Sequence, residues 1–175
     1  MSPSAFTFPM ITINLRAMGG NGAYIASAGG VPVSKRTHTD TDYRVDGHKV
    51  LVQSRQPMQN NTPVNSNSEN PIYLCGKTDK NGKVTVNTVA IYEKHKLVMT
   101  IDLKYDANGD IIPYANGGKG TTHAHRWPSG SDGEVGRKSH DPRNSLPYDS
   151  KYDSLLKKIV EFNKKGNIWK PRTEK

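Results

Sequence analysis

Residues 121–127 carry the side chains best suited to chemistry, and they read Thr-Thr-His-Ala-His-Arg-Trp. In a β-strand, side chains two positions apart point to the same side of the sheet, so His123 and His125 can face one pocket. Imidazole titrates near neutral pH, which allows one histidine to remove a proton while another donates one. The spacing therefore predicts an acid–base pair.

This pair suits cleavage of RNA without a metal ion or other cofactor. One imidazole would take the proton of a ribose 2′-hydroxyl, and the other would protonate the leaving 5′-oxygen. We expect Arg126 to hold the scissile phosphate and offset its charge. Thr121 and Thr122 would bind phosphate through their hydroxyls or backbone amides, and Trp127 would stack a base or form the pocket wall.

The same two histidines allow other interpretations. His-x-His is a common pair of metal ligands, and a carboxylate such as Asp102 or Asp141 would complete such a site. Two histidines alone do not specify a metal, and a purely structural role is the third possibility. We favour acid–base chemistry and expect no bound metal, with the other two roles left open.

Asp102 interrupts an apolar segment, residues 99–103. If Ile101 and Leu103 face the core, Asp102 faces the opposite side of the strand. There it is either an ordinary exposed carboxylate or a group that orients one of the histidines. We include it among the expected catalytic residues in the second role.

A second polar cluster follows at residues 136–143, which read Gly-Arg-Lys-Ser-His-Asp-Pro-Arg. Its cations and hydroxyl favour contacts with phosphate, and an ordinary basic loop is the alternative. His140 could be the second member of the acid–base pair in place of one of the first two histidines. The substrate-binding residues expected here are Arg137, Lys138, Ser139 and Arg143.

The composition points to a polyanionic partner. The chain has 175 residues and a formal net charge of +9, and 33% of its residues are hydrophobic. Basic proteins bind nucleic acids because lysine and arginine release counterions from phosphate backbones. The single cysteine, Cys75, lies in an apolar run and is expected to be a buried core thiol, which excludes an internal disulfide.

Alternating apolar residues and turn sequences predict an antiparallel meander of about four strands, at residues 71–78, 83–92, 97–105 and 110–112. Two of the three turns between these runs contain Asn-Gly, which favours hairpins because both residues accept positive φ. Apolar residues from Tyr152 to Phe162 recur at helical spacing, with Asp149 or Ser150 at the start and Gly166 at the end. The expected fold class is therefore α+β with a C-terminal amphipathic helix.

The chain divides into three expected parts. Residues 1–45, rich in Gly, Ser and Thr, predict a loosely ordered arm or linker; residues 46–170 form the catalytic domain, and residues 171–175 a tail. No apolar stretch reaches the ~20 residues of a membrane span, and the first residues lack the pattern of a secretory signal. We expect a monomer.

Several of these features together resemble C-terminal toxin domains of bacterial polymorphic toxins and their prophage-encoded relatives. The resemblance rests on the strand at residues 99–103, the turn at 105–109, the Thr-His-Ala-His-Arg-Trp motif, Gly136-Arg137 and the terminal helix, and it covers residues 72–169. It implies the fold of the barnase, EndoU, colicin E5/D and RelE group, a helical part followed by a four-stranded meander. This chain differs from that group because no helix is evident before the meander.

The resemblance also implies a function. Members of the group are metal-independent endoribonucleases that a separate delivery module carries into the cytoplasm of competing cells. A cognate immunity protein neutralises them in the producing cell. The sequence leaves two other hypotheses open, a non-enzymatic module that binds nucleic acid or a protein partner, and a metal-dependent nuclease.

Overall fold

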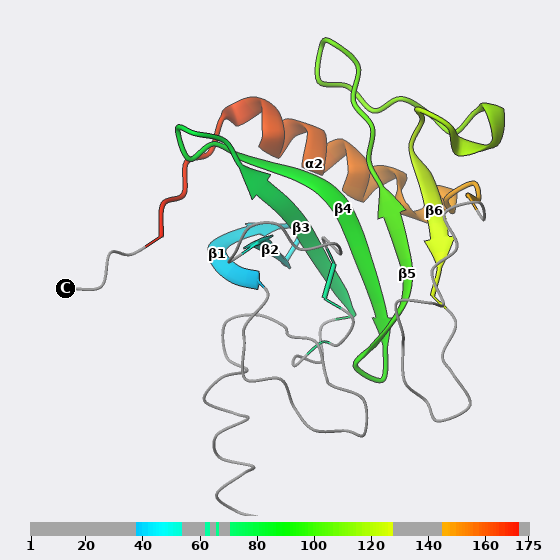
Figure 1. Cartoon of the computed structure of the whole chain (residues 1–175), viewed down its shortest axis with the longest axis horizontal. Coiled ribbons are helices and arrows are strands. Elements are labelled where there is room, and N and C mark those ends of the chain that lie inside the picture. Colours follow the sequence, from blue (N-terminus) through cyan, green and yellow to red (C-terminus); the bar gives the residue numbers. More distant parts are fainter. Residues whose placement is uncertain (1–37, 54–61, 64–65, 67–70, 128–144, 172–175) are drawn as a thin grey trace, which may run out of the picture.

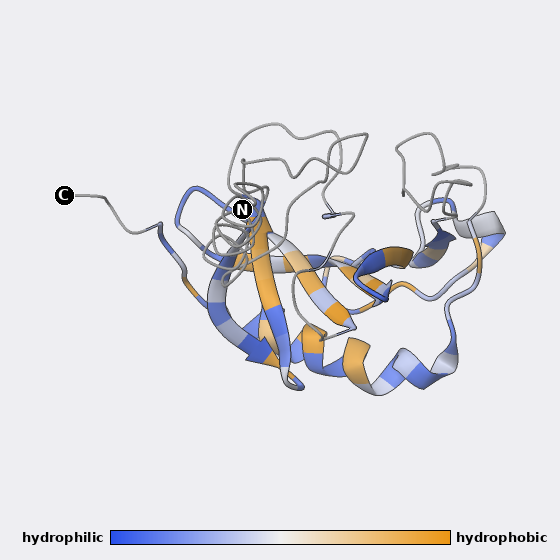
Figure 2. Ribbon diagram, turned by 90° about the horizontal axis from the view of Figure 1, so that it is seen from below, coloured by the Kyte–Doolittle hydropathy of each residue, from blue (hydrophilic) through white to orange (hydrophobic). Residues whose placement is uncertain are grey.

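The computed structural model describes residues 38–53, 62–63, 66, 71–127 and 145–171. Within them the chain forms a twisted β-sheet with one long helix, α2, lying along one face (Figures 1 and 2). The expected α+β class is confirmed. Most of the expected arm and the expected tail lie outside these residues. No helix in the described part of the chain is long and apolar enough to cross a membrane.

The sheet has six strands that follow one another in sequence order from edge to edge. They are β1 His38–Val45, β2 His48–Gln53, β3 Ile72–Thr78, β4 Val84–Glu93, β5 Lys96–Asp102 and β6 His123–Arg126. Neighbouring strands are antiparallel except β2 and β3, which are parallel. The prediction of a purely antiparallel sheet of about four strands is therefore wrong in strand number and in one pairing.

Residues 38–45 belong to the sheet and not to the expected arm. They form β1, which pairs with β2 through a tight turn at Asp46 and Gly47, whose φ angles are 53° and 78°. Asp-Gly is a strong hairpin signal because both residues tolerate positive φ. The sequence did not predict β1 because the strand is mostly polar. Its Thr41 can nevertheless be buried, since the hydroxyl donates to the carbonyl of Val50 at 2.7 Å.

The strand expected at residues 110–112 is not part of the sheet. Of these residues, Ile111 makes one isolated bridge, to Tyr105. The Asp106 carboxylate accepts the backbone N–H groups of Asn108 at 2.8 Å and Asp110 at 3.0 Å, which closes a tight loop outside the sheet. The position beside β5 is therefore open to β6, which carries the two histidines.

The two faces of the sheet bury different sets of side chains. The helix face packs against α2 and includes Val50, Leu74, Val89, Ile101 and Ala124. The opposite face, here called the site face, includes Leu51, Tyr73, Cys75, Ala90, Tyr92, Leu97 and Trp127. Cys75 is buried, so the prediction of a buried core thiol is confirmed, and burial raises the pKa of this thiol to about 12.

Helix α2 spans Asp153–Lys165 and follows a short 3-10 turn, η3, at Ser150–Tyr152. The Asp149 side chain accepts the backbone N–H of Lys151, and Gly166 ends the helix with a left-handed φ of 69°. The predicted end at Gly166 is thus confirmed, because glycine adopts positive φ without strain. Asp149 caps the 3-10 turn that leads into the helix, whereas the N-cap of α2 itself is Tyr152, which makes no side-chain capping bond. The buried residues of α2 are Leu155, Leu156, Ile159, Phe162 and Asn163.

Asn163 ties α2 to β4 with two hydrogen bonds. Its Oδ1 accepts the backbone N–H of Val86 at 2.9 Å, and its Nδ2 donates to the Val86 carbonyl at 3.3 Å. The hydroxyl of Tyr105 also donates to that carbonyl, at 2.6 Å. Side chains therefore replace the strand that would otherwise pair with this part of β4.

We predict that Asn163→Ala lowers the free energy of unfolding by about 1–3 kcal/mol, because it leaves the buried N–H of Val86 without its acceptor. Chemical denaturation measures the change. Glu161→Ala, at an exposed position of the same helix, is the control and should change stability by less than about 0.5 kcal/mol. Equal effects of the two substitutions would contradict this role of Asn163.

Candidate active site

The pairing of β5 with β6 assembles the candidate site. Asp102 lies directly opposite His123, and Thr100 lies opposite His125. Directly paired residues of antiparallel strands share a face, so all four side chains lie on the site face of the sheet. The structure thus brings together three of the five expected catalytic residues.

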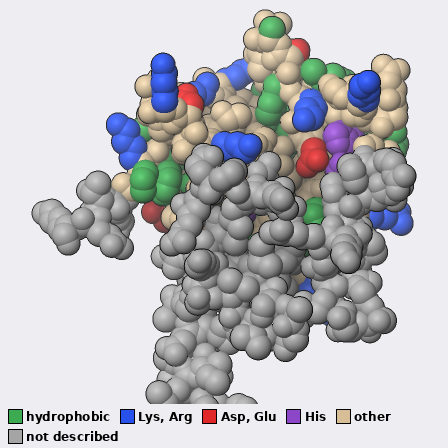
Figure 3. All heavy atoms as spheres, viewed as in Figure 1, with side chains coloured by type: hydrophobic (Ala, Val, Ile, Leu, Met, Phe, Trp, Pro, Cys, Tyr) green, Lys and Arg blue, Asp and Glu red, His purple; other side chains and the backbone are tan. Residues whose placement is uncertain are grey.

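The two imidazole rings are in contact. Their centroids are 4.7 Å apart, and the ring planes meet at 88°. Nε2 of His125 lies 3.4 Å from Oδ2 of Asp102, and Nε2 of His123 lies 3.7 Å from the same oxygen. Figure 3 shows histidine side chains beside an acidic side chain on one face of the molecule. Both reactive nitrogens therefore converge on one carboxylate oxygen.

The backbone fixes the ring of His123. Its Nδ1 lies 2.7 Å from the carbonyl oxygen of Thr121. A carbonyl oxygen only accepts, so Nδ1 carries the proton and the neutral ring presents a lone pair at Nε2. Thr121 is itself held in place, because its hydroxyl bonds to both the N–H and the carbonyl of Ala115. No signal in the sequence indicated this role of Thr121.

The three side chains differ in their access to solvent. The side chain of Asp102 is 36% exposed, compared with 12% for His123 and 4% for His125. The carboxylate thus forms the outer part of the cluster and the imidazoles the inner part. A ligand arriving from solvent meets Asp102 and His123 before His125.

Gly118 supports His123 from the side, and the sequence analysis did not single it out. It is the last residue of the short 3-10 turn η1 at Asn116–Gly118 and has a φ of 87°. A Cβ at this position would lie 2.6 Å from Cβ of Ser145 and 3.1 Å from Cβ of His123. Only glycine allows this close approach, which packs the segment after β5 against β6.

Arg126 does not join the cluster. It is exposed and pairs with Met99, one position away from the pairing of His125 with Thr100. Side chains alternate along a strand, so Arg126 points to the helix face of the sheet, away from the imidazoles. The expectation that it holds a phosphate beside the two histidines therefore conflicts with its position on the strand.

Thr122 and Trp127 are buried and make contacts within the protein. The Thr122 hydroxyl accepts the N–H of Lys104 at 3.0 Å and donates to its carbonyl at 3.3 Å. The Trp127 Nε1–H donates to the hydroxyl of Thr100 at 3.1 Å, and its ring belongs to the site-face core. Trp127 therefore packs into the core on the same face of the sheet as His125, and its exposed fraction of 6% leaves little ring surface for stacking a base.

The remaining expected residues belong to residues 128–144, which lie outside the described part of the chain. They are His140 among the expected catalytic residues, Arg137, Lys138, Ser139 and Arg143 among the substrate-binding residues, and Asp141 as an alternative metal ligand.

The geometry permits two kinds of chemistry. Two adjacent imidazoles can exchange protons with a substrate, and a nearby carboxylate can stabilise a charged imidazolium. Alternatively, one ligand atom from each of Asp102, His123 and His125 can bind a metal ion, since the three atoms lie within 4.8 Å of one another. Asp102 was a candidate for both roles, and its position beside both histidines is compatible with either.

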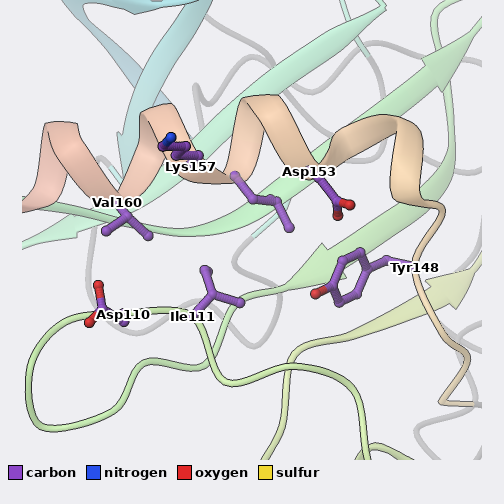
Figure 4. A pocket seen from close by; sticks show the side chains of 7 residues that line it. Asp110, Ile111, Tyr148, Asp153, Lys157 and Val160 are labelled. Atoms are coloured by element: carbon purple, nitrogen blue, oxygen red, sulfur yellow. The ribbon is translucent and has the colours of Figure 1, made fainter.

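A concavity lies on the helix face of the sheet, between α2 and the loop after β5 (Figure 4). It has a volume of about 250 Å³. Its lining residues are Asp110, Ile111, Tyr148, Asp153, Leu156, Lys157 and Val160. None of these is a histidine or an expected site residue, so the cluster on the site face is the stronger candidate for chemistry.

Comparison with protein-family models, with curated proteins and with solved structures finds no match to this chain.

We predict that Gly118→Ala destabilises the protein more than Gly117→Ala does, by about 1–3 kcal/mol, because the added methyl group overlaps Ser145 and His123. Gly117 is the matched control, since its φ is also positive, at 67°, and a Cβ there meets nothing within 4 Å. Both variants share the backbone cost of a positive φ, about 1–2 kcal/mol. Equal unfolding free energies in denaturant would show that Gly118 has no packing role.

Proposed function

We propose that this protein is a metal-independent endoribonuclease of the toxin type, with His123 and His125 as its acid–base pair. The observation that carries the proposal is the contact of two imidazoles with each other and with one carboxylate on a single face of the sheet. Side chains with these properties can transfer two protons in one reaction.

In the proposed reaction, His123 acts as the base because its neutral form presents a lone pair at Nε2. Nε2 takes the proton of a ribose 2′-hydroxyl, and the 2′-oxygen attacks the adjacent phosphorus. The bond to the 5′-oxygen breaks, and that oxygen receives a proton from His125. The products are a 2′,3′-cyclic phosphate and a 5′-hydroxyl, and proton exchange with water restores the two histidines.

Asp102 is a positioning residue in this scheme. Its carboxylate lies within ion-pair distance of whichever histidine is protonated. Approach of an anionic phosphate to this carboxylate is unfavourable, so the scheme requires cations near the substrate. The net charge of +9 favours binding of a polyanion such as RNA. We propose that Arg137, Lys138 and Arg143 supply the cations that contact its phosphates.

The proposed biological setting follows from the resemblance of residues 72–169 to polymorphic toxin domains. A separate module delivers the protein into the cytoplasm of a target cell, where it cleaves RNA. A cognate immunity protein binds it in the producing cell. A metal-dependent nuclease is the second candidate function, because three potential ligand atoms converge at the same site.

We predict that His123→Ala and His125→Ala each lower the rate of RNA cleavage by about 10²–10⁴-fold, the usual contribution of a general acid or base. Cleavage of a labelled RNA in the presence of a chelator measures the rate. An RNA with 2′-deoxy substitution at the cleaved position should not react, because it lacks the nucleophile. Because His125 is buried, alanine at this position could unfold the protein. His125→Gln keeps most of the side-chain volume, and thermal unfolding of each variant shows whether a loss of activity reflects a loss of fold.

His95→Asn is the control for these variants. His95 is exposed in the turn between β4 and β5, and asparagine suits its φ of 68°. This variant should cleave RNA at the wild-type rate. Unchanged cleavage by both site variants would rule out the acid–base pair, whereas activity that is lost in chelator and restored by a divalent ion would favour the metal-dependent nuclease.

A further inference from the structure

We propose that Asp102, His123 and His125 also form a binding site for Zn²⁺, and that the bound ion reversibly blocks the enzyme. The binding site stands on the geometry of the three side chains alone. The block rests on the proposed acid–base function, because it requires that the same nitrogen atoms exchange protons during cleavage.

The distances between the ligand atoms fit a zinc ion. Two atoms that each lie ~2.1 Å from a tetrahedral ion are about 3.4 Å apart. Nε2 of His125 lies 3.4 Å from Oδ2 of Asp102, and Nε2 of His123 lies 3.7 Å from it. One ligand atom from each of the three residues fits within 4.8 Å of the others.

The surroundings of His123 are those of a metal ligand. Histidines that bind metals generally donate their other ring N–H to a carbonyl or a carboxylate, which orients the ring and fixes the lone pair on the binding nitrogen. His123 makes this contact from Nδ1 to the Thr121 carbonyl at 2.7 Å. Its Nε2 therefore faces the cluster with a lone pair available before any ion arrives.

The identity of the ligand atoms selects the ion. Two imidazole nitrogens and one carboxylate oxygen suit Zn²⁺ and its transition-metal neighbours, whereas Mg²⁺ and Ca²⁺ prefer oxygen ligands. The carboxylate also offsets part of the charge of the ion. The site thus discriminates against Mg²⁺, the divalent ion that commonly accompanies RNA phosphates.

Zinc binding is incompatible with proton transfer by the same two rings. An imidazole nitrogen bonded to a metal has no lone pair to accept a proton and no proton to donate. Since Nδ1 of His123 is engaged by Thr121, a bound ion leaves that ring without a free nitrogen. The ion also occupies the space beside Asp102 where the substrate would have to enter. Bound Zn²⁺ therefore converts the site to an inactive state.

Zinc titration of the untagged full chain, first treated with chelator, tests the site without any measurement of activity. We expect one ion per chain by calorimetry and a higher unfolding temperature in excess Zn²⁺, because the ion binds the folded state. Asp102→Asn should weaken binding at least tenfold, and His123→Gln should weaken it further. His95→Asn, which changes a histidine outside the cluster, should bind within twofold of wild type.

Wild-type affinity in Asp102→Asn and His123→Gln would overturn the site, as would loss of binding in His95→Asn or equally tight binding of Mg²⁺. The second arm measures RNA cleavage over the same range of Zn²⁺. Cleavage should fall in step with occupancy and recover when a chelator is added. If Zn²⁺ binds as expected but cleavage appears only in its presence, the metal site stands, and both the block and the metal-independent function fail.

Discussion

The register between β5 and β6 is the constraint on which the candidate site depends. It places Asp102 opposite His123 and Thr100 opposite His125, so that a carboxylate and two imidazoles share one face. A slip of one residue would turn both histidines toward α2 and would bring Ala124 and Arg126 to the site face. The chemistry of the cluster is thus a consequence of strand pairing and not of the motif alone.

Contacts on both sides of the sheet maintain this register. Ala124 is buried in the core beneath α2 and also pairs with Leu146, a residue 22 positions further along the chain. On the opposite face, the hydrogen bond from Trp127 to Thr100 joins the end of β6 to the middle of β5. Gly118 packs against His123 from the connection between the strands. The apolar core and a few specific polar contacts therefore position the imidazoles together.

Local signals in the sequence predicted much of this arrangement, including the strands at β3 to β5, the C-terminal end of α2 and the shared face of His123 and His125. Long-range features were not predictable from such signals. The parallel pairing of β2 with β3 joins segments that a polar stretch separates, and β1 is too polar to show the usual alternation. The roles of Thr121 and Gly118 depend on backbone positions, which residue type alone does not indicate.

In the proposed reaction, the two histidines cleave RNA by activating the ribose 2′-hydroxyl of the RNA. The chemical groups at the ends of the RNA fragments test this reaction most directly. Mass spectrometry of the fragments formed in chelator identifies both ends of each cut. We expect a 2′,3′-cyclic phosphate on one fragment and a 5′-hydroxyl on the next. Fragments that carry a 3′-hydroxyl and a 5′-phosphate would contradict it, because water would then be the nucleophile.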